Sequence, residues 1–112
     1  GSEMCIRDRV IVGSSYGGTM AVQYVAENEN TVKKLILLAP ALNLPELKVP
    51  ENKIFKVPVI MYHGTKDDVI NPYVVKDIAQ KIFSNLEHHL LDDDHSLHVT
   101  FLHLKWSDLF EI

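Results

Sequence analysis

Short hydrophobic runs alternate with segments of helical periodicity along this chain. Apolar runs occur at residues 10–12, 35–38, 57–62 and, less continuously, 86–91. The run at 35–38 has no polar interruption, which is typical of a parallel strand buried on both faces. Between the runs, residues 18–27 and the segment after Pro72 carry apolar side chains at helical spacing. The pattern predicts an α/β fold, with a parallel sheet flanked by helices.

The helical segments predict which side chains face the core. In residues 18–27 the expected buried stripe consists of Met20, Ala21, Tyr24 and Val25. Asn71 and Pro72 are typical of the cap and first turn of a second helix. The expected buried stripe of that helix consists of Val74, Val75, Ile78 and Ile82.

Two segments lack a clear period. Residues 41–56 are rich in Pro, Leu, Lys and Glu, and we expect a plain connecting loop rather than a short lid. After His95 the chain carries Val99, Leu102, Leu104, Trp106, Leu109 and Phe110. This spacing suits a terminal helix on the sheet, with Trp106 in the core.

The segment Gly13-Ser14-Ser15-Tyr16-Gly17 links the first run directly to the first helix. G-x-S-x-G between a strand and a helix is the pattern of a nucleophile elbow, a tight turn that exposes the serine hydroxyl. The glycines remove side chains that would collide across the strained turn. Ser15 is therefore the candidate nucleophile, against the alternative of an ordinary turn.

Acid and base candidates follow later strands. Asp67 comes after the run at 57–62, and His95 comes after the run at 86–91. Because parallel strands end at one edge of a sheet, we expect Ser15, Asp67 and His95 to meet there. Asp68 is the alternative acid, and His63 is expected to order the acid turn.

Each residue type suits one catalytic role. A neutral His95 would take the proton of Ser15 as the hydroxyl attacks a carbonyl carbon. The Asp67 carboxylate would fix the imidazole tautomer and stabilise the imidazolium. The backbone N–H of Tyr16, at the helix start, would donate to the developing oxyanion.

The chain resembles the carboxyl-terminal part of a small α/β hydrolase of the serine esterase type. The elbow, the acid turn His63-Gly64-Thr65-Lys66-Asp67 and the histidine loop Asp94-His95-Ser96 carry the resemblance in the order of that fold. The resemblance implies a partial α/β-hydrolase fold over residues 10–112 that lacks the amino-terminal strands. Family members more often carry histidine before the elbow serine, where this chain has Ser14.

Residues 1–9 are set apart from this domain. Met4-Cys5-Ile6-Arg7-Asp8-Arg9 resembles the translation of a transposon-end adapter used in sequencing libraries, a processing scar to be excluded from fold reasoning. A natural start is the alternative. The single cysteine lies in this segment, so no disulfide framework is expected.

Charge and composition narrow the functional classes. The chain has 112 residues, a net charge of −4 and mixed acids and bases, which does not indicate a nucleic-acid surface. No apolar run reaches the roughly 18 residues of a membrane span. The run Asp92-Asp93-Asp94 is expected to be a polar turn rather than a metal site with His95. The elbow has Ser15 where a phosphate loop requires glycine, and it lacks the lysine of such a loop.

The sequence therefore predicts a serine hydrolase of carboxylic esters or thioesters that uses no cofactor or metal. The partner is a small-molecule substrate, and a cytoplasmic location is expected, with an upstream signal peptide left open. Acyl and leaving-group specificity, amide substrates and oligomeric state also stay open. The alternative is a truncated or inactive hydrolase-fold fragment that acts at most as a binding module.

Overall fold

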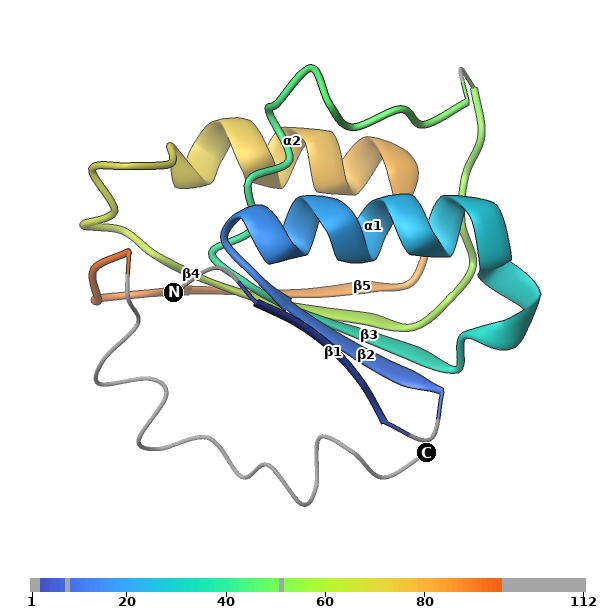
Figure 1. The fold of residues 1–112 in the computed structure, drawn as a ribbon. Coiled ribbons are helices and arrows are strands. Elements are labelled where there is room, and N and C mark those ends of the chain that lie inside the picture. The colour runs from blue at the N-terminus through green and yellow to red at the C-terminus, as the bar shows by residue number, and fades with distance from the viewer. Residues whose placement is uncertain (1–2, 8, 51, 96–112) are drawn as a thin grey trace.

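A five-stranded sheet organises the chain in a computed structural model that describes residues 3–7, 9–50 and 52–95 (Figure 1). The strands lie side by side in chain order: β1 (Glu3–Arg7), β2 (Val10–Ser14), β3 (Lys34–Leu38), β4 (Val59–Gly64) and β5 (Leu86–Leu91). Strands β2 to β5 are parallel, and β1 runs antiparallel to β2. The four predicted strands are confirmed as β2 to β5.

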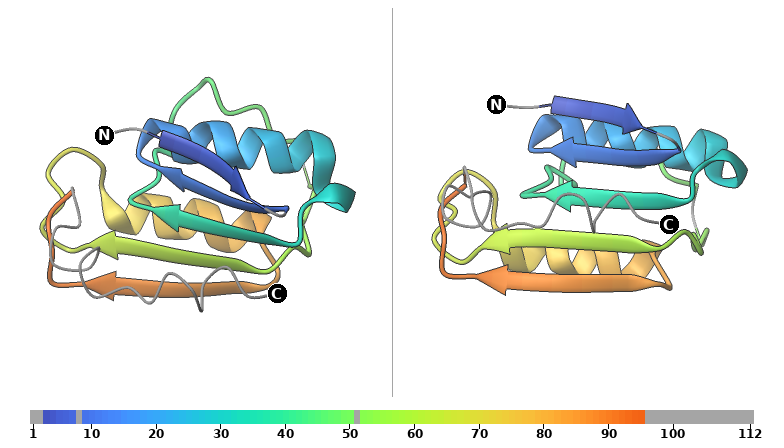
Figure 2. Two further views of the ribbon diagram at one scale, coloured as in Figure 1. Left: turned by 60° about the horizontal axis from the view of Figure 1, so that its bottom comes forward. Right: turned by 90° about the horizontal axis from the view of Figure 1, so that it is seen from below.

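Two helices, α1 (Tyr16–Asn28) and α2 (Pro72–Ile82), cover one face of the sheet in the described part of the chain (Figure 2). A short 3₁₀ turn, η1 (Glu29–Thr31), follows α1. The predicted cap of α2 is confirmed, since Asn71 Oδ1 accepts hydrogen bonds from the Tyr73 and Val74 N–H groups at 2.9 and 3.3 Å. No helix among the described residues is both long and apolar enough to cross a membrane.

Strand β1 differs from the sequence-based expectation, which assigned no element to residues 1–9. Glu3–Arg7 pairs with the whole of β2, from Glu3 opposite Ser14 to Arg7 opposite Val10. A buried strand cannot leave one row of backbone N–H and C=O groups unpaired without a large cost, so a neighbouring extended segment is favoured. Met4 also packs against the core.

The main core lies between the sheet and the two helices. It includes Ile11, Ala21, Val22, Val25, Leu35, Leu37, Val59, Met61, Val75 and Ala79. The prediction that residues 35–38 form a strand buried on both faces is confirmed, because all four side chains are at most 7% exposed.

The prediction of burial is wrong for two residues of the helical stripes. Met20 is 46% exposed and Val74 is 44% exposed. Each helical residue turns about 100° from its neighbour, so a stripe centred on Ala21 and Val75 leaves the preceding position toward solvent. Thr19 is buried instead. Its hydroxyl is satisfied there because it donates a hydrogen bond to the Ala41 carbonyl.

The connection from β3 to β4 contains no helix or named strand in its described residues. It is nevertheless packed, since Ala41, Leu42 and Phe55 are at most 5% exposed. Phe55 also forms an isolated parallel β-bridge with Phe83. The expected connecting loop is confirmed. The predicted terminal helix and the core position of Trp106 lie outside the described residues.

The register of α2 can be tested by truncating its adjacent valines. Val75 is fully buried, so Val75→Ala should reduce the free energy of unfolding by about 1.5–3 kcal/mol through lost apolar burial and a residual cavity. Val74→Ala, on the exposed side, should change it by less than about 0.5 kcal/mol. Urea unfolding of both variants measures the difference, and equal losses would contradict this register.

Candidate active site

Ser15 lies at the junction of β2 and α1 in a strained backbone conformation, with φ 53° and ψ −122°. Such angles are rare outside glycine and cost on the order of 1–3 kcal/mol. Three backbone hydrogen bonds hold the turn: Ser15 N–H donates to the Leu38 carbonyl at 3.0 Å, and the Ser15 carbonyl accepts from Gly18 and Ala41 at 3.0 and 2.9 Å. The strained turn is therefore held by β3, by the first turn of α1 and by the loop after β3.

Close packing around the turn requires glycine at two positions. A Cβ atom on Gly13 would lie 2.6 Å from the Gly17 carbonyl oxygen and 2.7 Å from Ala21 Cβ, so the collision at Gly13 is with the Gly17 backbone and Ala21 rather than with a side chain at position 17. A Cβ atom on Gly18 would lie 2.5 Å from Pro40 Cβ. The role of Gly18 was missed, and the glycine doublet was its signal in the sequence.

The structure brings Ser15, His95 and Asp67 together at the carboxyl edge of the sheet. Ser15 Oγ lies 3.0 Å from His95 Nε2, and His95 Nδ1 lies 2.7 Å from Asp67 Oδ2. The His95 side chain is 22% exposed, and that of Asp67 is fully buried. The three groups form one hydrogen-bonded chain from a buried carboxylate to a hydroxyl.

Asp67 is held on both carboxylate oxygens. Oδ1 accepts from the backbone N–H groups of Val69 and Ile70, each at 2.8 Å. Oδ2 lies 2.9 Å from His63 Nε2 in addition to its contact with His95. Burial alone would raise the pKa of Asp67, but these hydrogen bonds together outweigh burial and lower it.

Of the two candidate acids, Asp67 is the one that contacts His95. Asp68 is exposed. The Asp67 side chain points inward because the turn at 67–70 folds its N–H groups back onto Oδ1. The preference for Asp67 in the sequence thus agrees with the geometry.

His63, at the end of β4, is fully buried against Asp67. Burial lowers the pKa of His63, although its hydrogen bond to Asp67 and the charge of that carboxylate act in the opposite direction. A neutral His63 must carry its proton on Nε2 to donate to the carboxylate. The expected contact between His63 and the acid turn is present.

The segment that precedes His95 is bound to the acid turn through backbone contacts. Lys66 N–H donates to the Asp93 carbonyl at 3.0 Å, and Thr65 N–H donates to the Leu91 carbonyl at 2.7 Å. Gly64 allows this approach, because a Cβ atom there would overlap the Asp93 carbonyl group. Sequence reasoning missed Gly64, whose signal was its position directly after His63.

The acidic run beside His95 shows no cation site. Lys66 pairs with Asp92 at 3.1 Å, and Asp93 Oδ1 accepts from Asp94 N–H at 2.8 Å. Within residues 3–7, 9–50 and 52–95, no group of three or more His, Cys, Asp or Glu side chains is placed to hold a metal ion.

Tyr16 is the first residue of α1, directly after Ser15, and its side chain is 45% exposed. Its backbone N–H therefore lies at the positive end of the helix dipole. The role of this N–H as an oxyanion donor stays a prediction.

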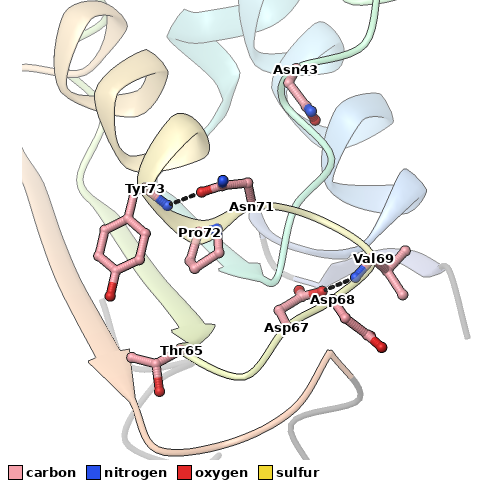
Figure 3. Close-up of a pocket in the computed structure, with 8 residues that line it drawn as sticks. All are labelled: Asn43, Thr65, Asp67, Asp68, Val69, Asn71, Pro72 and Tyr73. Carbon is pink, nitrogen blue, oxygen red and sulfur yellow. Dashed lines mark hydrogen bonds between the residues drawn. The ribbon is translucent and has the colours of Figure 1, made fainter.

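A cavity of about 460 Å³ borders the acid turn (Figure 3). Its lining comes from the β3–β4 loop, the acid turn and the start of α2, and consists of Asn43, Thr65, Asp67, Asp68, Val69, Asn71, Pro72 and Tyr73. The acid turn thus borders open space, while the Asp67 side chain itself is buried.

The other described histidines lie on β5. His89 Nε2 lies 2.7 Å from Glu87 Oε2, and the His89 ring stacks on Tyr62 with centroids 4.9 Å apart. Burial lowers the pKa of His88. Neither side chain is hydrogen bonded to Ser15, Asp67 or His95 in the structure. His98 and His103 lie outside the described residues.

The sequence matches a family model described as serine aminopeptidase, S33, over residues 3–55. It is also 37% identical over 68 residues to acyl-protein thioesterase 1 homolog 2 of Dictyostelium discoideum. That alignment covers 57% of this chain and 30% of the thioesterase. The chain spans less than a third of the length of this relative.

Solved structures share the fold at low sequence identity. An alpha-beta serine hydrolase homologue from Coxiella burnetii has a TM-score of 0.67 and 21% identity, covering 81% of this chain and 42% of that protein. Est1E from Butyrivibrio proteoclasticus has a TM-score of 0.67 and 19% identity, with 81% and 55% covered.

A mouse protein, alpha/beta hydrolase domain-containing protein 10, has a TM-score of 0.69 and 18% identity, covering 89% of this chain and 60% of that protein. The chain therefore spans under two thirds of each of these structures. The strand order, the two helices and these similarities agree, and the chain has the fold of part of an α/β hydrolase.

Proposed function

We propose that the protein is a serine hydrolase of carboxylic esters or thioesters that works through an acyl-serine intermediate. The observation that carries the proposal is the hydrogen-bonded chain from Asp67 Oδ2 through His95 to Ser15 Oγ, with contacts of 2.7 and 3.0 Å. These distances lie within the reach required for a nucleophile, its base and the group that orients the base.

In the first half-reaction Ser15 Oγ attacks the carbonyl carbon and its proton passes to His95 Nε2. Asp67 stabilises the resulting imidazolium without taking the proton. The carbonyl π electrons move to oxygen, where the Tyr16 N–H donates a hydrogen bond. The tetrahedral intermediate then expels an alcohol or thiol, which takes the proton from His95.

In the second half-reaction water attacks the acyl-serine carbonyl as His95 Nε2 takes one of its protons. Collapse of this intermediate breaks the bond to Ser15 Oγ, which recovers its proton from His95. A carboxylic acid is released, and the site returns to its starting state. No redox change occurs, so the cycle needs no cofactor.

Two similarities support the substrate class. The aligned relative from Dictyostelium discoideum is named as a thioesterase, and one solved neighbour, Est1E, has been crystallised with ferulic acid. Both names describe the chemistry of carboxylic acyl groups. The alternative is an inactive hydrolase-fold fragment that only binds. It is supported by coverage, because the chain matches only 30% of the thioesterase and 55% of Est1E.

The nucleophile can be identified with adjacent serines as a matched pair. Full-length protein should hydrolyse short p-nitrophenyl esters and be labelled by a fluorophosphonate probe. Ser15→Ala should abolish labelling, because no other hydroxyl is bonded to His95 in the described structure. Ser14→Ala should retain it.

Mass spectrometry that locates the label on Ser14, or unchanged labelling of Ser15→Ala, would rule out Ser15 as the nucleophile. A folded wild-type protein that neither turns over esters nor reacts with the probe would instead support the inactive fragment.

The acid can be identified with neighbouring aspartates. Asp67→Asn should lower kcat/KM about 10⁴-fold, because an amide no longer favours the required imidazole tautomer. Asp68→Asn, at an exposed position, should stay within about threefold of wild type. Ester hydrolysis by the two variants measures the contrast, and a larger loss in Asp68→Asn would reverse the assignment.

The neutral state of His63 predicts acid sensitivity. Its pKa is lowered on folding, so the unfolded chain binds more protons as the pH falls below about 6.5 and the native state is destabilised. His63→Gln should remove this contribution. Thermal unfolding between pH 5 and 8 should therefore show a steeper acid-side fall in Tm for wild type than for the variant. Parallel curves would contradict a neutral buried imidazole.

A further inference from the structure

We infer that His63 is a positioning residue that sets the basicity of His95 through their shared carboxylate oxygen. The inference rests on the proposed function, in which His95 is the base. Asp67 Oδ2 lies 2.7 Å from His95 Nδ1 and 2.9 Å from His63 Nε2. One oxygen therefore serves two imidazoles, one at the end of β4 and one in the segment after β5.

The geometry fixes both tautomers. An ionised carboxylate only accepts hydrogen bonds, so both facing ring nitrogens must carry protons. His95 is then protonated on Nδ1 and presents the lone pair of Nε2 to Ser15. His63 is then protonated on Nε2, and its buried Nδ1 holds a lone pair.

Competition for one oxygen determines the direction of the effect. The N–H of His63 withdraws electron density from Oδ2, which weakens the stabilisation that this oxygen gives to a His95 imidazolium. Without His63 the carboxylate would stabilise a His95 imidazolium more strongly.

The rest of the carboxylate stays anchored when His63 is altered. Oδ1 accepts hydrogen bonds from the Val69 and Ile70 N–H groups at 2.8 Å each. Loss of His63 should therefore remove a hydrogen bond from Oδ2 while the Asp67 side chain keeps its position. Another titratable group that bears on the pair is His88, which interacts with His63 from β5. Asp93 and Asp94 directly precede His95 in the sequence.

Two substitutions separate the hydrogen bond from the bulk of the ring. His63→Phe keeps a ring of similar size but removes the donor. His63→Gln places an amide N–H near the position of Nε2 and so preserves a donor without a titrating group. The matched pair distinguishes an effect of the hydrogen bond from a packing effect.

The experiment follows the ring of His95 by NMR titration of full-length protein with labelled histidine, assigned with His95→Gln. His63→Phe should raise the pKa of His95 by about 0.5–1 unit, and His63→Gln should leave it within about 0.2 unit of wild type. The acid limb of kcat/KM should move by the same amounts. Near-ultraviolet circular dichroism checks the fold of both variants.

An unmoved His95 pKa in folded His63→Phe, or equal shifts in both variants, overturns the inference. Should His63→Phe not fold, ¹⁵N shifts of wild-type His63 decide: a proton on Nε2 supports the inference, and a proton on Nδ1 overturns it. If the His95 pKa responds to the His63 variants as expected but the wild-type protein does not turn over esters, the proposed function is rejected. If the wild-type protein turns over esters but the His95 pKa does not move in His63→Phe, only the role of His63 is rejected.

Discussion

The Asp67 carboxylate is the group on which the geometry of the site depends. Four N–H groups converge on it: two from its own turn, one from His63 on β4 and one from His95 on the histidine loop. A buried carboxylate without such donors would be protonated or would destabilise the fold. The same contacts that make its burial tolerable also aim His95 at Ser15, so stability and geometry have one cause here.

Most of this arrangement was predictable because parallel strands end at a common edge. Four strands followed from apolar runs, and Ser15, Asp67 and His95 each follow the end of one of them. The choice of Asp67 over Asp68 followed from spacing. Motif order could thus predict a convergence that no single residue indicates.

What sequence reasoning missed depends on contacts between distant segments. Gly18 and Gly64 are needed because Pro40 and Asp93 approach them, and the glycines alone do not indicate which distant residue makes the approach. The exposure of Met20 and Val74 follows from the exact rotation of each helix on the sheet, which apolar spacing fixes only to within one residue. Strand β1 arises because β2 offers a free edge, a property of the assembled sheet.

The backbone of Ser15 limits which amino acids evolution or design can place there. At φ 53° and ψ −122° a second substituent on Cβ would crowd the main chain, since β-branched residues are the least tolerant of positive φ. Threonine carries the same hydroxyl and is excluded on steric grounds. Cysteine, which is unbranched at Cβ like serine, is a nucleophile of comparable size that this backbone accommodates.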